Sequence, residues 1–323
     1  MATYYGTYGQ KVQYLASDPS DPQIGQVWYN STSATLKVRQ EATVNAWASG
    51  GNLNTARRTI TGSGTQTAAL GFGGSPNSTA TESYNGTSWT TSPNSLNTGR
   101  GDGAGAGIQT STLFFGGDDG VSLLATTESW NGTSWSPAPS LNTARNNLGG
   151  CGISNTSALA FGGEAPGSPT TAATESYNGS SWTTSPNSLN TARRTVRGAG
   201  TQTAALAIGG SPNLTATESW NGTSWTTVSN LNTGRGDGAA AGIQTLALFF
   251  GGDNGVSYVA NTELWNGSSW TATTAMTTAR NNLGGAGTQT AAVGFGGETP
   301  GPVSAATEEW TGIEAQTKTV TVT

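Results

Sequence analysis

The sequence contains no histidine and only one cysteine, and these shortages exclude several classes of function. Histidine is the commonest general base and a frequent zinc ligand, so its absence removes both roles. A single cysteine, Cys151, cannot form an internal disulfide, and we interpret it as a small strand residue because it stands where Ala286 stands in a later copy of the same stretch. No carboxylate pair, nucleophile triad or phosphate loop stands out. We therefore expect a protein that is not an enzyme and holds no cofactor or metal.

Charged residues and long apolar runs are also scarce. Only 10% of the 323 residues are charged, and 13 Lys and Arg against 18 Asp and Glu give a formal net charge of -5. Nucleic-acid binding needs a concentrated basic face, so we expect no nucleic-acid partner. No apolar run is long enough to span a membrane, which predicts no membrane insertion. Residues 1–20 lack the charged start and apolar core of a secretion signal.

The dominant feature that the sequence does have is a repeated stretch. The chain is poor in the Leu, Lys and Glu that helices favour and holds 48 glycines, which indicates an all-β protein. Thr-Glu-Ser-Tyr-Asn-Gly-Thr-Ser-Trp occupies residues 81–89, and related copies begin at Thr127, Thr174, Thr217, Thr262 and Thr307. An Asn-Gly pair between two short runs rich in Thr, Ser and aromatics predicts a hairpin, because a type I′ turn needs positive φ at both central residues. Each copy is therefore predicted to be two antiparallel strands joined by a tight turn.

Six repeat units can be marked at the phrase Leu-Asn-Thr-(Ala/Gly)-Arg or its variant, and they begin at Leu53, Leu96, Leu141, Leu189, Leu231 and Met276. Steps of 42 to 48 residues with four short runs per unit are typical of four-stranded propeller blades. The first run is made almost wholly of small residues, as in GDGAGAG at 101–107, so we expect it to be the innermost strand. The openings ARRT, GRGD and ARNN recur in that order in units one to three and four to six. This indicates duplication of a three-blade half.

The units closely resemble kelch repeats, over about 260 of the 323 residues. The kelch pattern has an Arg opening the first strand, a double glycine ending the second, an aromatic in the third and a Trp in the fourth. The Arg residues here are Arg57, Arg100, Arg145, Arg193, Arg235 and Arg280, and the glycine pairs begin at Gly73, Gly116, Gly162, Gly209, Gly251 and Gly296. The third-strand aromatics are Tyr84, Trp130, Tyr177, Trp220, Trp265 and Trp310, and the fourth-strand residues are Trp89, Trp135, Trp182, Trp225 and Trp270. The resemblance implies a six-bladed kelch-like β-propeller. Galactose oxidase shares this blade type, but its copper site uses histidines, so that activity is excluded here.

The sixth unit lacks its Trp, and the other end of the chain offers one. Trp47 lies six residues before Leu53, which is the interval between Trp135 and Leu141. We therefore predict that residues 42–48 form the outer strand of the last blade and close the ring. The tail at 317–323 alternates like a strand and competes for the same edge. The predicted domains are an N-terminal arm or hairpin at 1–41 and a propeller at 42–323.

Regular placement of aromatic and charged residues indicates structural roles. We expect the fourth-strand tryptophans and Trp47 to pack between blades, with sugar stacking as the alternative. A Glu recurs in every third strand, at Glu82, Glu128, Glu175, Glu218, Glu263 and Glu308. We expect these six to form ion pairs or backbone caps with the six repeated arginines, the alternative being an anion-binding ring of arginines at the channel mouth. Arg-Gly-Asp at 100–102 and 235–237 is read as part of the repeat and not as an integrin motif.

The loops between second and third strands vary in length and chemistry while the hairpin turns do not. A rigid ring that carries diverse loops on one rim is typical of a binding surface. The candidate binding residues in these loops are Asp118, Asp119, Glu164, Asp253, Asn254, Tyr258 and Glu298. Asp118, Asp119, Asp253 and Asn254 offer oxygen ligands for Ca²⁺, but in separate loops they are too few to predict a metal site.

Residues 1–41 lie outside the repeat and suggest attachment to a larger assembly. The stretch 26–40 is predicted to be a hairpin turning around residues 30–34, and DPQIGQVWYNSTSATLKV at 21–38 resembles segments near the start of tail and fibre proteins of bacteriophages. The resemblance implies a virion protein, either a tail fibre or a capsid-decoration subunit, bound to other virion proteins through residues 1–41. Its propeller would bind a host-surface glycan or protein, and homo-oligomer formation stays open. The alternative is a free-standing, lectin-like carbohydrate- or protein-binding propeller.

Overall fold

A computed structural model describes residues 12–23, 25–41, 45–211, 215–313 and 315–320. These residues form 28 strands in seven four-stranded sheets and contain no helix, so the all-β prediction is confirmed. Within the described part of the chain, no helix has the length and apolar character needed to cross a membrane.

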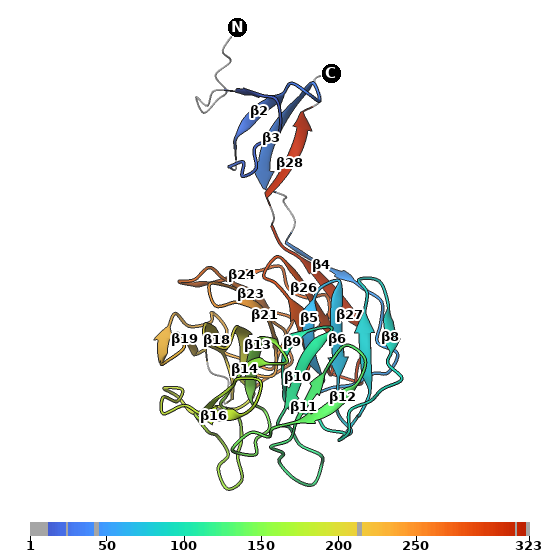
Figure 1. The fold of residues 1–323 in the computed structure, drawn as a ribbon, viewed down its shortest axis with the longest axis vertical. Coiled ribbons are helices and arrows are strands. Elements are labelled where there is room, and N and C mark those ends of the chain that lie inside the picture. Colours follow the sequence, from blue (N-terminus) through green and yellow to red (C-terminus); the bar gives the residue numbers. More distant parts are fainter. Residues whose placement is uncertain (1–11, 24, 42–44, 212–214, 314, 321–323) are drawn as a thin grey trace. The chain divides into compact units, whose positions relative to one another are not determined.

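The chain divides into two compact units, and the boundary differs from the predicted one. Met1–Asn45 and Thr311–Thr323 form one unit, called here the terminal unit, and Ala46–Trp310 form the other, called the repeat unit. The C-terminal residues, expected within a propeller domain at 42–323, therefore belong with the N-terminal residues. The reason is strand pairing: β28 (Ala315–Val320) is antiparallel to β3 (Thr35–Glu41) through six consecutive residue pairs (Figure 1).

The terminal unit is one sheet in the order β1-β2-β3-β28. β1 (Gln13–Leu15) is parallel to β2 (Val27–Asn30), and β2 and β3 form a hairpin across residues 31–34. The indole of Trp28 is fully buried and donates to Asp18 Oδ1 (2.9 Å). Asn30 Nδ2 donates to the same oxygen (2.7 Å) and Lys37 Nζ lies 2.6 Å from Oδ2. Asp18 thus ties the segment between β1 and β2 to the sheet, and the bonds from Asn30, Lys37 and Trp28 lower its pKa to about 2.

The repeat unit contains the other six sheets, each with four antiparallel strands. The first strands are β5 (Thr61–Thr65), β9 (Ala104–Ile108), β13 (Gly149–Ser154), β17 (Arg197–Gly200), β21 (Ala239–Ile243) and β25 (Gly284–Gly287). The second strands are β6 (Ala68–Phe72), β10 (Ser111–Phe115), β14 (Ser157–Phe161), β18 (Ala205–Ile208), β22 (Leu246–Phe250) and β26 (Ala291–Phe295). The third strands are β7 (Thr81–Tyr84), β11 (Thr127–Trp130), β15 (Thr174–Tyr177), β19 (Thr217–Trp220), β23 (Thr262–Trp265) and β27 (Thr307–Thr311). The fourth strands are β8 (Trp89–Thr91), β12 (Trp135–Ala138), β16 (Trp182–Thr184), β20 (Trp225–Val228), β24 (Trp270–Thr273) and β4 (Ala46–Ser49).

The fourth strand of the last sheet comes from the start of the repeat unit. The sheet has the order β25-β26-β27-β4, and just beyond β4 Gly50 N donates to Thr307 O and Leu53 N to Ala305 O (both 2.9 Å). Trp47 packs against Trp310 and against Phe250 of the preceding sheet, with ring centroids 5.5 and 4.9 Å apart. Of the predicted strand at 42–48, residues 42–44 lie outside the described residues.

The core lies between the sheets and at their meeting point. Six clusters of buried apolar side chains each join two neighbouring sheets, and one of them joins β25 and β26 to β6, β7 and β8. The first strands contact one another in chain order, and β25 contacts β5. Small residues permit this approach, because a Cβ on Gly62 would lie 2.5 Å from Gly285 O and one on Gly198 would lie 2.4 Å from Gly150 O.

The hairpins between third and fourth strands exist, but their turn type was predicted wrongly. Tyr84 pairs with Trp89, so four residues, not two, connect the strands. Gly86 has φ +88°, whereas Asn85 does not have the positive φ that a type I′ turn requires. The Asn85 side chain acts instead, because its Oδ1 accepts from Thr87 N (3.0 Å) and Ser88 N (2.9 Å).

Candidate functional site

The repeated arginines and glutamates form six buried ion pairs, one within each sheet. All twelve side chains are at most 3% exposed. Each guanidinium contacts the Glu of its own third strand: Arg57–Glu82 (2.7 Å), Arg100–Glu128 (2.5 Å), Arg145–Glu175 (2.8 Å), Arg193–Glu218, Arg235–Glu263 (2.5 Å) and Arg280–Glu308 (2.9 Å). Each guanidinium also donates to backbone carbonyls, as Arg57 Nη1 does to Gly73 O (2.8 Å) and Ala80 O (2.9 Å).

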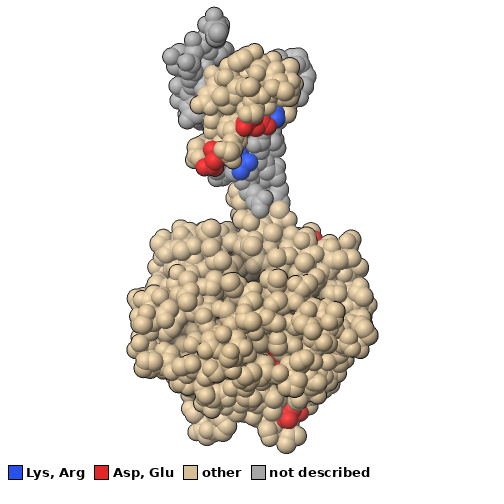
Figure 2. All heavy atoms as spheres, in the orientation of Figure 1, with Lys and Arg blue, Asp and Glu red and all other residues tan. Residues whose placement is uncertain are grey.

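The second glutamate oxygen caps the loop that enters the sheet. Glu82 Oε2 accepts from Asn54 N (2.7 Å) and from Asn54 Nδ2 (2.9 Å), and the other five glutamates accept from the equivalent backbone N–H. Burial lowers the pKa of each of the six guanidinium groups and the paired glutamate opposes this shift. These arginines are therefore engaged inside the sheets and are not free to bind an anion. On the visible face of the repeat unit, accordingly, nearly all atoms belong to uncharged residues (Figure 2).

A second set of polar residues gathers where the first strands begin. The residue two positions before each first strand has positive φ. These residues are Thr59, Asp102, Asn147, Thr195, Asp237 and Asn282, with φ from 49° to 57°. Their backbones are linked in succession, since Asn147 N donates to Asp102 O, Thr195 N to Asn147 O and Asn282 N to Asp237 O (all 2.7 Å). Left-handed backbone suits Asn and Asp better than most residues, which accounts for four of the six side chains.

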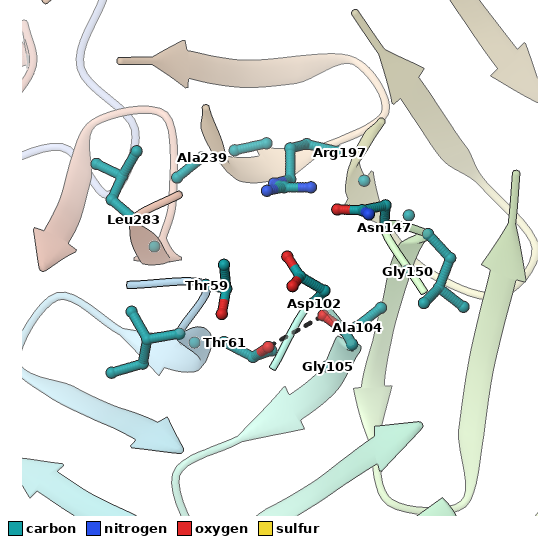
Figure 3. Close-up of a pocket in the computed structure, with 18 residues that line it drawn as sticks. Thr59, Thr61, Asp102, Ala104, Gly105, Asn147, Gly150, Arg197, Ala239 and Leu283 are labelled. Atoms are coloured by element: carbon teal, nitrogen blue, oxygen red, sulfur yellow. Dashed lines mark hydrogen bonds between the residues drawn. The ribbon is translucent and has the colours of Figure 1, made fainter. Parts of the chain in front are cut away.

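Three of these residues, Thr59, Asp102 and Asn147, line an axial cavity of about 90 Å³ together with Arg197 (Figure 3). Asp102 and Arg197 point into it. Arg197 Nε donates to Gly238 O (2.7 Å), and its Nη2 lies 3.8 Å from Asp237 Oδ1. Burial raises the pKa of Asp102 to about 6, although Arg197 partly opposes this, and burial also raises the pKa of Asp237. The volume suits a few water molecules, each of which needs about 10–15 Å³ of such space, and is below the usual size of an organic ligand pocket.

Sequence reasoning missed Arg197, Asp102 and Asp237 as a group. A signal for Arg197 was present, because unit four reads ARRTVR where unit one reads ARRTIT, so that Arg197 replaces Thr61. The two aspartates were read only as parts of a repeated Arg-Gly-Asp.

Four of the seven candidate binding residues hold their own loops. Asp118 Oδ1 and Asp253 Oδ1 accept from Gly120 N and Gly255 N (both 2.6 Å). Asp119 Oδ1 accepts from Val121 N (2.9 Å) and Ser122 N (2.8 Å), and Asn254 Oδ1 accepts from Val256 N (3.0 Å) and Ser257 N (2.9 Å). Among the residues that the structure describes, no three His, Cys, Asp or Glu side chains come together as a metal site would require.

Glu164 and Glu298 join loops of neighbouring sheets. Glu298 accepts two bonds from Arg58 Nη1 (2.9 and 2.8 Å), and Glu164 accepts one from Arg194 Nη1 (2.7 Å). Both arginine side chains are about two-fifths exposed, at 42% and 41%. The two ion pairs therefore lie at the surface, at positions related by the internal duplication.

Three candidates, Asp253, Tyr258 and Glu298, meet in one groove. The groove, called here the rim groove, has a volume of about 420 Å³ and is lined by residues 253, 255–258 and 298–301. Burial and the charges of Glu298 and Asp253 raise the pKa of Tyr258, while Asn281 and Arg58 act in the opposite direction. The remaining candidates, Asp118, Asp119 and Glu164, belong to the duplicated counterpart of this groove, and Asn254 caps the loop.

Comparison with known proteins supports the fold alone. No protein-family model matches the chain, and no curated protein matches it. Its structure is similar to a solved one titled "Structure of YjhT", a propeller-like protein, with a TM-score of 0.67 and 15% sequence identity. The match covers 83% of this chain and 99% of that one. The chain thus has an all-β, propeller-like fold.

Proposed function

We propose that the repeat unit is a six-bladed kelch-like propeller whose ring is closed by β4. The main support is a bond made by the fourth-strand tryptophans, in which the indole N–H reaches the Thr that opens the third strand of the preceding sheet. The pairs are Trp47 to Thr262 (3.0 Å), Trp89 to Thr307 (2.9 Å), Trp135 to Thr81 (2.8 Å), Trp182 to Thr127 (3.2 Å), Trp225 to Thr174 (2.9 Å) and Trp270 to Thr217 (3.0 Å). Trp47 therefore occupies the place of the missing sixth Trp.

A second set of bonds supports the same closure. A Gln or Asn in each turn between first and second strands donates to the carbonyl that ends the third strand of the preceding sheet. For the first sheet, Gln66 Nε2 donates to Trp310 O (2.7 Å), which joins the first repeat to the last. Glycine pairs of positive φ that end the second strands, such as Gly73 (φ +66°) and Gly74 (φ +114°), match the kelch pattern.

The protein acts in our proposal as a non-enzymatic binding protein, and the observation that carries this is the rim groove. The hairpin turns keep one geometry in five sheets, whereas the loops after the second strands differ, and two of them bring Asp253, Tyr258 and Glu298 around an open cavity of about 420 Å³. This volume lies within the range of about 300–1,000 Å³ that is usual for ligand sites.

We further propose that the protein is a bacteriophage virion component, a tail fibre or capsid-decoration subunit, in which the terminal unit attaches to other virion proteins. The support is the resemblance of residues 21–38 to phage fibre segments and the presence of a separate sheet built from both chain ends. The rim would face a host-surface glycan or protein. A free-standing lectin-like propeller is the alternative.

Two measurements test this function. Gold-labelled antibody against the full chain should decorate intact phage particles, and particles without label would overturn the virion placement. Purified full-length protein should bind host cells, and the triple variant D253A/Y258A/E298A should lose that binding. A matched variant in the hairpin turns, T223A/S224A, should retain it. Equal binding by both variants would contradict the role of the rim.

A further inference from the structure

We propose that the rim groove is a subsite for a neutral saccharide, and that its duplicated counterpart at residues 118–123 and 164–168 is not. This inference rests on the proposed binding function of the rim and specifies its ligand. The two positions derive from the same duplicated half, so each residue of the groove has an equivalent. Asp253 corresponds to Asp118, Val256 to Val121, Tyr258 to Leu123, Thr299 to Ala165 and Glu298 to Glu164.

The first loop of the groove has the same backbone framework at the two positions. Asp253 pairs with Gly236 and Tyr258 in isolated bridges, and Asp118 pairs with Gly101 and Leu123 in the same way. Both loops expose the valine at their tip almost completely, at 92% for Val256 and 91% for Val121. In this first loop the two positions therefore differ in side-chain chemistry. The second loops also differ in the course of the backbone, because Glu298 pairs with Val303 whereas Ala165 pairs with Ser168.

Tyr258 provides what a sugar-binding groove needs and Leu123 does not. An aromatic ring offers a flat apolar face to the C–H face of a pyranose, and the phenol adds a hydrogen-bonding group at one end. Tyr258 is held at the base of its loop by its bridge to Asp253, in a partly buried position. The bridge holds the backbone of Tyr258 in place, and the residue lines the same groove as Asp253 and Glu298 before any ligand arrives, which reduces the entropy lost on binding.

The polar groups around Tyr258 are acceptors with spare capacity. An ionised carboxylate has about four lone-pair positions. Glu298 uses two for Arg58, and Asp253 uses one for Gly255 N, so positions remain for the hydroxyl groups of a sugar. Sugar hydroxyls can donate to such acceptors, whereas the carboxylate or sulfate group of an anionic saccharide can only accept and would be repelled by the carboxylates.

The charge of the groove favours a neutral ligand over a cation as well. Arg58 lies 2.8 Å from Glu298 and balances its charge, so that Asp253 is the one acidic group of the groove lining left without a cationic partner. A single, partly exposed carboxylate in contact with water attracts an amine only weakly. Hydrogen bonding and ring contact, which do not depend on ligand charge, therefore dominate recognition.

The test uses the full-length protein on an array of neutral, anionic and amine-bearing saccharides, followed by calorimetric titration of the best neutral one. Y258L gives the groove the residue of its counterpart, and L123A is the matched control at the other position. We expect a neutral saccharide to bind, Y258L to weaken it at least tenfold and L123A to leave it unchanged. Y258F separates the ring from the hydroxyl and should retain part of the affinity. Thermal unfolding of each variant checks that the fold is intact.

Each other result overturns the inference. Binding that survives in Y258L, binding lost equally in L123A, or a preference for charged saccharides would each do so. If no neutral saccharide on the array binds, but host-cell binding still requires residues 253, 258 and 298, the saccharide assignment is wrong and the proposed function stands. If the wild-type protein does not bind host cells, the proposed function is wrong.

Discussion

At the scale of single residues, the protein places 12 of its 31 charged residues (13 Lys and Arg plus 18 Asp and Glu) in six buried ion pairs. Removing one partner of a buried pair leaves the other charge unpaired in a poor solvent, and this is far more costly than removing an exposed pair. The six Arg–Glu pairs therefore make each sheet dependent on two specific side chains. The exposed pairs at the rim, such as Arg194–Glu164, are free to vary.

Replacing Glu218 by Gln should destabilise the repeat unit by about 3–5 kcal/mol, because Arg193 then stays buried without its carboxylate. Replacing Glu164 by Gln is the control, since its partner Arg194 is 41% exposed and such pairs contribute less than about 1 kcal/mol. Urea unfolding followed by tryptophan fluorescence measures both. Similar losses for the two variants would show that burial does not decide the contribution of these pairs.

Replacing Asp102 by Asn should change how stability depends on pH. Burial raises the pKa of this carboxyl from 3.8 to about 6, so the folded protein binds the proton more tightly than the unfolded chain. The stabilising contribution of protonated Asp102 is therefore complete below about pH 4 and is lost as the pH rises to about 6. The two values differ by an amount equivalent to roughly 3 kcal/mol, so the variant should be more stable than the wild type at about pH 7.5 by up to that amount, and similar to it at about pH 4.

Unfolding experiments across this pH range check the prediction, and Asp119→Asn is a useful contrast. Bonds from Ser122 N and Val121 N lower the pKa of Asp119, so its contribution has the opposite sign and is lost as the pH falls. A pH profile of D102N that parallels the wild type would mean that Asp102 is not desolvated in the axial cavity.

At the scale of elements, the repeat unit depends on a strand that comes from outside the six repeats. β4 supplies Trp47, whose ring packs on Phe250 and Trp310 and whose indole N–H bonds to Thr262. Every other fourth strand is continuous with its own unit. If the ring is closed as we propose, β4 should matter as much as any internal fourth strand.

Replacing Trp47 by Ala should therefore destabilise the repeat unit by about 3 kcal/mol, at the low end of values for buried Trp because Trp47 is only partly buried. Trp135→Ala, in an internal sheet, is the matched comparison and should cost about 3–5 kcal/mol. Denaturant unfolding gives both values. A loss below about 1 kcal/mol for Trp47→Ala would argue against β4 as an integral strand.

At the scale of the whole molecule, both chain ends belong to one sheet that is separate from the repeats. β28 covers the edge of β3, and without it β3 would present an unpaired row of backbone groups. The terminal unit is small, and a small sheet has little apolar area with which to offset the loss of one strand of four.

Removing residues 312–323 should unfold the terminal unit and leave the repeat unit folded. Hydrogen exchange followed by mass spectrometry should show lost protection at β2 and β3, with β5 to β27 unchanged. Loss of protection at β27 and β4 instead would mean that the C-terminal strand stabilises the repeats. A Val320→Ala variant, with its backbone intact, serves as a mild control.

The sequence by itself determined the architecture of the repeats, because the relevant information is local and recurs. Each unit carries its own Arg, glycine pair and Glu at fixed spacing, and five of the six carry a fourth-strand Trp. One copy therefore predicts four strands and their pairing, and the next copy repeats the same evidence. The interval between Trp47 and Leu53 pointed to β4 for the same reason. The alternation of small residues in the first strands reflects a close approach that any copy reveals.

Only the tertiary structure decided the features that depend on residues distant in the chain. The alternating tail predicted at 317–323 fits any open strand edge. Its described part lies in β28, and the pairing of β28 with β3 depends on residues that are distant in the chain. Asp253 and Tyr258 come together with Glu298 in one groove, because that groove forms between two loops of adjacent sheets. Arg197 and Asp102 come together only at the axis, where strands from separate sheets converge and burial alters the chemistry of a carboxylate.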